Sequence, residues 1–160
     1  MSRVTKADKS VSAIVQVLST KHPGITFSED NGFRWSPESK TIFYNPKSIR
    51  ALWSLLHEVG HMLNNHSNYS SDIGLLRLEV AAWSKAQEVA KDYGIVINEN
   101  HIQKCLDSYR DWIYKRSACP TCTQAGLERS RGIYSCINCS TKWKVTPERF
   151  CRPYRKTVAV

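Results

Sequence analysis

Apolar side chains recur at the three-to-four-residue spacing of an α-helix in four stretches of this chain. The spacing predicts helices over residues 10–20, 48–63, 72–93 and 99–116. Ser10 and Ser48 are suitable N-caps for the first two helices, and Gly94 is a suitable stop for the third. Short runs rich in β-branched and aromatic residues predict strands over residues 25–29, 41–45, 133–134 and 142–145. These elements together indicate an α+β fold.

The positive charge of the chain is concentrated near its C-terminal end. The formal net charge is +9, and residues 117–160 contain eight basic but only two acidic side chains. Residues 51–116, with seven basic and eight acidic side chains, are close to neutral. We therefore expect two domains, 1–116 and 117–160, without a flexible linker between them. No apolar run is long enough to cross a bilayer and no secretory signal is evident, so a cytoplasmic location is expected.

His57 and His61 lie four residues apart in the second predicted helix. Their imidazoles therefore leave the same face of the helix and can bind one zinc ion. Glu58 follows the first histidine, a position that suits a general base acting on water. Gly60 costs about 1 kcal/mol relative to Ala inside a helix, so we expect a neighbouring element to approach closely there.

A catalytic zinc site needs a third protein ligand. Glu79 is the best candidate, because it interrupts the apolar stripe of the third helix, where a carboxylate is costly unless it is paired or bound to metal. Asp72 and His101 are the alternatives. His66 would point away from the metal if the second helix continued to that residue.

The pattern His57-Glu58-x-x-His61, followed by Glu79-x-x-Ala82, resembles the gluzincin-type zinc metallopeptidases, and among them the small ImmA/IrrE-like group. The resemblance covers roughly residues 25–94. It implies a zincin-like fold with a small sheet and three or four helices, zinc ligands His57, His61 and Glu79, and Glu58 as general base. It also implies that residues 41–44 line the cleft and pair with an extended substrate.

Two C-x-x-C pairs predict a second metal site, Cys119/Cys122 and Cys136/Cys139. Each pair can present two thiolates from a tight turn, and four thiolates close a tetrahedral structural zinc site. This spacing is typical of a zinc ribbon, and a disulfide interpretation is weaker in a reducing compartment. Of the remaining cysteines, Cys105 is expected to be a buried apolar filler, and Cys151 has no partner that the sequence identifies.

Basic and aromatic residues are interleaved in the ribbon segment. Cations attract phosphates, and aromatic faces can stack on unpaired bases, so DNA is a candidate partner. An ordinary solvated basic surface around an aromatic mini-core has equal weight. The candidate nucleic-acid contacts are Arg129, Arg131, Lys142, Trp143 and Lys144. SprT-like proteases, which act on proteins attached to DNA, are similar in joining an HExxH domain to a zinc ribbon, although this chain offers Glu79 rather than a clear third histidine.

The leading hypothesis is therefore a zinc-dependent metallopeptidase acting on a DNA-associated protein, either a repressor or a DNA-bound protein. One alternative is a non-enzymatic nucleic-acid- or protein-binding module with a relic HExxH site, against which the intact Glu58 argues. Another is a zinc hydrolase of a non-peptide amide. Peptide hydrolysis also requires a donor for the developing oxyanion, and the candidates are His66, Tyr69 and Tyr93.

Overall fold

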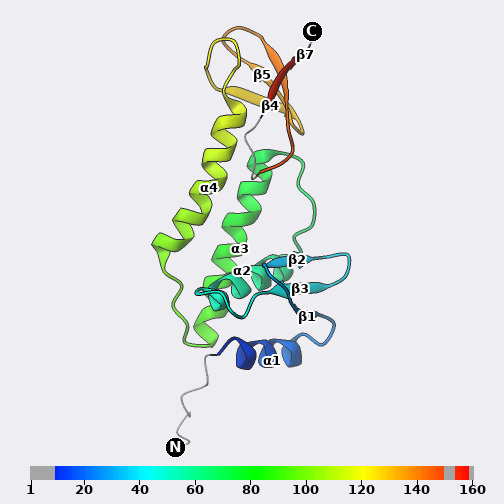
Figure 1. Ribbon diagram of the computed structural model, residues 1–160, viewed down its shortest axis with the longest axis vertical. Coiled ribbons are helices and arrows are strands. Elements are labelled where there is room, and N and C mark those ends of the chain that lie inside the picture. The colour runs from blue at the N-terminus through cyan, green and yellow to red at the C-terminus, as the bar shows by residue number, and fades with distance from the viewer. Residues whose placement is uncertain (1–9, 150–153, 159–160) are drawn as a thin grey trace, which may run out of the picture. The chain divides into compact units, whose positions relative to one another are not determined.

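The computed structural model describes residues 10–149 and 154–158, and Figure 1 shows the course of the chain. The helices are α1 (Val11–Lys21), α2 (Ala51–Leu63), α3 (Asp72–Asp92) and α4 (Glu99–Ser117). The strands are β1 (Thr26–Glu29), β2 (Arg34–Ser36), β3 (Thr41–Tyr44), β4 (Gly126–Ser130), β5 (Ile133–Cys136), β6 (Lys142–Val145) and β7 (Arg155–Val158). The expected α+β fold is confirmed. In the described part of the chain, no helix combines the length and apolar content that a bilayer crossing requires.

The chain divides into two compact units. The first comprises residues up to 67 and 78–99, and the second comprises residues 68–77 and 100–160. This division differs from the expected 1–116 and 117–160, because the start of α3 and nearly all of α4 group with the C-terminal sheet. Composition and charge do not indicate that the start of α3 and most of α4 pack with the ribbon.

Two of the predicted helix boundaries can be compared with the caps of the structure. The Ser10 hydroxyl accepts a hydrogen bond from the backbone N–H of Ala13 at 3.2 Å, so the predicted N-cap of α1 is confirmed. The prediction of Ser48 as the N-cap of α2 is wrong. Ser48 lies in the preceding turn, where its carbonyl accepts from the N–H of Ala51, and Arg50 is the cap residue.

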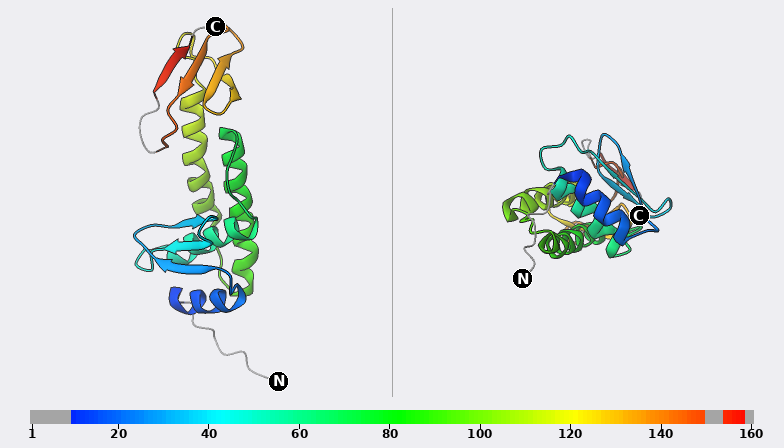
Figure 2. Two further views of the ribbon diagram at one scale, coloured as in Figure 1. Left: turned by 90° about the vertical axis from the view of Figure 1, so that its right-hand side faces the viewer. Right: turned by 90° about the horizontal axis from the view of Figure 1, so that it is seen from below.

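Strand β3 is the centre of the three-stranded sheet in the first unit. The order is β1-β3-β2, with β1 parallel and β2 antiparallel to β3 (Figure 2). Both edges of β3 are therefore occupied, and the expectation that residues 41–44 pair with a substrate is wrong. The edge strands are β1 and β2. Strand β2 was not predicted, because its three residues are too few to show a hydrophobic period.

In the core of the first unit, α2 packs against the three-stranded sheet and against α3. Small residues on α3 allow the two helices to approach very closely: a Cβ added at Gly60 would lie 2.2 Å from the carbonyl oxygen of Ala82. The close approach expected at Gly60 is thus confirmed. The fully buried side chains of this core include Leu18, Ile42, Leu55, Leu56, Val59, Ala82 and Ala86.

A buried ion pair organises the second unit. Nε and Nη2 of Arg116, on α4, donate to the carboxylate of Asp72, the first residue of α3, at 2.6 and 3.3 Å. The Tyr134 hydroxyl donates to the same carboxylate. Burial and this hydrogen bond raise the pKa of Tyr134, so it stays protonated as a donor. Removing one partner of such a buried pair typically costs about 3–5 kcal/mol, because the other charge is left uncompensated.

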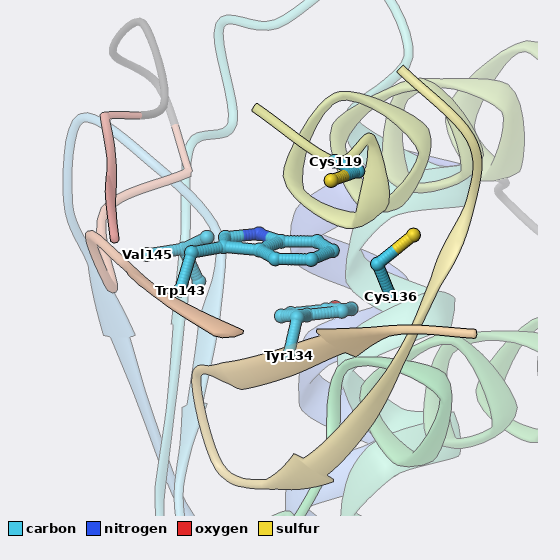
Figure 3. Packing of buried hydrophobic residues seen from close by; sticks show 5 residues of the cluster. All are labelled: Cys119, Tyr134, Cys136, Trp143 and Val145. Atoms are coloured by element: carbon cyan, nitrogen blue, oxygen red, sulfur yellow. The ribbon is translucent and has the colours of Figure 1, made fainter. Parts of the chain in front are cut away.

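The C-terminal sheet has the antiparallel order β4-β5-β6-β7. Its small core contains Cys119, Tyr134, Cys136, Trp143 and Val145, and Figure 3 shows the indole of Trp143 lying flat over the ring of Tyr134. The Trp143 indole N–H donates to the carbonyl of Arg116 at 2.9 Å. Strands β5 and β6 match the predicted strands, whereas β4 and β7 were not predicted.

The contact at Gly60 generates a stability prediction. We expect Gly60→Ala to lower the free energy of unfolding by about 1–3 kcal/mol, because overpacking between α2 and α3 outweighs the gain in helix propensity. Urea denaturation of the purified chain measures this change. Gly32→Ala is the matched control, since a Cβ there would meet nothing within 4 Å. Equal stability of the two variants would contradict the prediction.

Candidate metal centres

Three side chains of the first unit converge on one point. The Nε2 atoms of His57 and His61 are 3.1 Å apart, and Glu79 places Oε2 at 3.1 Å from His57 Nε2 and Oε1 at 3.6 Å from His61 Nε2. A tetrahedral zinc site with bonds of about 2.0–2.1 Å has ligand–ligand distances of about 3.3–3.4 Å. The observed spacing of these nitrogen and oxygen atoms therefore fits zinc. Helix α2 supplies both histidines, and α3 supplies the carboxylate.

Glu79 is buried, with an exposed fraction of 7%. Burial alone would raise its pKa, but hydrogen bonds to His57 and His61 outweigh burial and lower the pKa well below that of an ordinary carboxyl group. The structure thus brings an ionised carboxylate to the two histidines, as predicted. The alternatives are not part of this group: Asp72 pairs with Arg116, and His101 contacts the Cys105 sulfur at 3.7 Å.

Glu58 is positioned by the edge strand β2. The backbone N–H of Trp35 donates to Glu58 Oε2 at 2.8 Å. Burial raises the pKa of Glu58, and the nearby His57 and His61 together with the Trp35 N–H partly oppose that rise. A carboxylate with a raised pKa accepts a proton more readily than one in water. Sequence reasoning missed Trp35, and no motif in the sequence indicates it.

The two histidines have different surroundings. The ring of His57 stacks on the ring of Trp83, with centroids 4.2 Å apart and an interplanar angle of 28°. Its Nδ1 is buried and has no hydrogen-bond partner among the described residues. By contrast, Nδ1 of His61 lies 2.9 Å from Nδ1 of His66.

The condition attached to His66, that α2 continues to that residue, is not met: α2 ends at Leu63 and the chain turns back, which places His66 against Nδ1 of His61. Burial, followed by the neighbouring His61, lowers the pKa of His66 and favours its neutral form. The Trp35 indole N–H donates to the His66 carbonyl at 3.0 Å. Of the other oxyanion candidates, Tyr69 has its ring against the Arg131 guanidinium, 4.6 Å from the ring centre. Tyr93 lies at the end of α3, where its backbone N–H donates to the carbonyl of Ala90 at 3.1 Å.

The four ribbon cysteines form a second candidate metal centre. Cys119 Sγ lies 3.6 Å from Cys139 Sγ, and Cys122 Sγ lies 3.5 Å from Cys136 Sγ. Zinc–sulfur bonds of about 2.3 Å in a tetrahedron require sulfur–sulfur distances of about 3.8 Å. The four thiols are therefore close to the geometry that a structural zinc ion needs.

Backbone N–H groups point to two of the four sulfur atoms of this centre. The N–H of Thr121 points to Cys119 Sγ and the N–H of Asn138 points to Cys136 Sγ, each at 3.4 Å. Burial raises the pKa of Cys119, but hydrogen bonds from the backbone and from neighbouring thiols lower it to about 6. Cys105 is only half-buried and contacts His101, so it is not the buried apolar filler expected. Cys151 lies outside the described residues.

The candidate nucleic-acid contacts fall into two groups. Arg129, Arg131, Lys142 and Lys144 are exposed. Trp143 has an exposed fraction of 0%, so its ring has no free face on which a base could stack. Trp143 is therefore removed from the candidate contacts, because the alternation along β6 points it into the ribbon core.

If the two centres bind zinc separately, a mutation in one centre should remove only the zinc ion of that centre. We expect about two zinc ions per wild-type chain and about one in His57→Ala, since that change removes a ligand of the first centre only. Elemental analysis of chains refolded with zinc measures both. His22→Ala, which changes a histidine outside both centres, should keep two. A wild-type count of one would eliminate one of the centres.

The chain was also compared with protein-family models, with curated proteins and with solved structures, and none of these comparisons gives a match.

Proposed function

We propose that this protein is a zinc-dependent metallopeptidase that hydrolyses peptide bonds of a protein substrate. The observation that carries the proposal is the convergence of His57, His61 and Glu79 at zinc-ligand spacing, with Glu58 held beside them by the Trp35 N–H. Three protein ligands leave a fourth position open, which is typical of catalytic rather than structural zinc sites.

When bound to these ligands, zinc supplies a Lewis acid that polarises a carbonyl group and lowers the pKa of water. Glu58 then acts as the general base. Its Oε2 is held by the Trp35 N–H, which leaves Oε1 as the oxygen that takes a proton from the attacking water. The same carboxyl group later returns that proton to the leaving amine. Glu79 keeps a negative charge next to the histidines and so holds both rings in place.

A peptide is favoured over another amide because of the position of β2. Strand β2 is an edge strand, and its Trp35 N–H already reaches the general base. An extended peptide that adds to this edge would therefore lie beside Glu58, and edge strands commonly bind peptides in this way.

The role of Glu58 is testable by an isosteric change. We expect Glu58→Gln to keep zinc bound but to reduce cleavage of labelled casein by about 10²- to 10⁴-fold, because an amide can accept the Trp35 hydrogen bond but cannot take a proton. Gel and fluorescence assays of zinc-loaded chains, with and without duplex DNA, measure the rate. Glu88→Gln, at an exposed position of α3, is the control.

Two results would count against the peptidase. Undiminished cleavage by Glu58→Gln would assign the activity to other residues or to a contaminant. If the zinc-loaded wild type cleaved neither casein nor a DNA-bound protein nor itself, the binding-module alternative would be favoured.

We further propose that the ribbon carries the peptidase to DNA through one face of its sheet. Lys142 and Lys144 alternate with the buried Trp143 and Val145 along β6, so both lysines lie on the outer face. The register pairs Lys144 with Lys156 of β7, and Arg129 of β4 is exposed. Closely spaced cations of this kind attract the phosphate backbone without reading sequence.

Salt dependence tests this face. We expect the double change Lys142→Gln and Lys144→Gln to weaken binding to a fluorescent duplex and to reduce the slope of log K against log salt by about one per lost phosphate contact. Lys104→Gln with Lys115→Gln on α4 removes the same charge elsewhere in the second unit. If both double variants weakened binding equally, net charge rather than this face would be responsible.

A further inference from the structure

The C-terminus of α2 forms a Schellman turn. Asn65 has a positive φ of 52°, and its N–H donates to the carbonyl of Met62 at 3.0 Å. The N–H of His66 donates to the carbonyl of His61, also at 3.0 Å. These are the two hydrogen bonds that define the motif, with Asn65 as the left-handed residue and His66 as the residue after it.

This turn places His66 directly over the last helical turn. In a Schellman motif, the residue after the left-handed position commonly packs against the residue five positions earlier. That earlier residue is here His61, and the two rings meet with centroids 5.0 Å apart and their Nδ1 atoms 2.9 Å apart. The usual apolar contact of the motif is thus replaced by a contact between two imidazoles.

The geometry determines which nitrogen of each ring carries a proton. His61 Nε2 faces His57 and Glu79, so it must keep a lone pair if it is to bind metal. The proton of neutral His61 is then on Nδ1, which donates to Nδ1 of His66. His66 in turn carries its own proton on Nε2. A hydrogen bond of this kind fixes the ring orientation and tautomer of a metal ligand.

Strand β2 holds His66 in place from the other side. The Trp35 indole N–H donates to the His66 carbonyl, while the Trp35 backbone N–H donates to Glu58. One residue therefore supports both the general base and the turn behind His61. His57 has no comparable hydrogen bond among the described residues, because its Nδ1 lacks a partner.

We propose that His66 is a positioning residue of the catalytic centre, which accepts the Nδ1–H of His61 and so presents His61 Nε2 to the zinc ion. This inference rests on the proposed function, since it requires zinc at His57, His61 and Glu79. It assigns His66 to the support of a ligand rather than to the oxyanion.

A matched pair of substitutions separates hydrogen bonding from shape. Asn places its side-chain oxygen where the His66 Nδ1 lies, and Leu has nearly the same shape without an acceptor. We expect His66→Leu to weaken zinc binding at this centre by about 10- to 100-fold, the usual effect of losing such a support, and His66→Asn to restore most of the affinity.

Zinc competition against a chromophoric chelator, performed on the full chain, measures the affinity. The His57→Ala chain keeps only the four-cysteine centre and so measures the zinc affinity of that centre. The four-cysteine centre should have the same affinity in every His66 variant. The Asn65→Gly variant keeps a residue suited to positive φ and should bind zinc as the wild type does, whereas Asn65→Val should behave like His66→Leu.

Equal zinc affinity of the Leu, Asn and wild-type chains would overturn the role of His66 and leave the proposed function standing. Equal loss in Leu and Asn would also overturn it, because ring shape rather than the acceptor would then matter. Absence of zinc binding by the wild type at this centre would instead reject the proposed function itself.

Discussion

The close contact between Gly60 and Ala82 is the constraint on which the candidate metal centre of His57, His61 and Glu79 depends. Two helices with side chains at their interface normally lie 8–10 Å apart, and the absence of a side chain at Gly60 allows the backbone of α3 to approach α2. Because Ala82 is one turn beyond Glu79, the same contact sets the carboxylate against the histidines of α2. Gly60 lowers the helix propensity of α2, but it allows the close packing of α2 against α3 that brings the ligands together.

This close packing makes a charged cluster tolerable in an apolar core. An isolated buried carboxylate would be strongly destabilised, and so would an unpaired buried imidazolium. The Glu79 carboxylate lies at hydrogen-bond distance from His57, and Trp83 stacks on the His57 ring.

The second unit solves the problem of a small core differently. Its buried apolar cluster is small, so the second unit also contains polar interactions: the Asp72–Arg116 pair, the Tyr134 hydroxyl and the four thiols. Each of these joins residues far apart in the sequence. Lys142 and Lys144 are exposed on the outer face of the sheet.

The sequence alone determined most of the candidate metal ligands, because side chains from one helix or one tight turn have a fixed spacing. His57, His61 and the two C-x-x-C pairs follow from local geometry, and Glu79 follows from its position in an apolar stripe. Tertiary structure decided what local spacing does not encode. It made β3 a central strand, buried Trp143, placed the start of α3 with the ribbon, and brought Trp35 to Glu58. The turn that brings His66 onto His61 is local, and Asn65 at the end of α2 was the sequence signal for it. Contacts between residues 20 or more positions apart depend on how whole elements pack, and no periodicity within one element reports that packing.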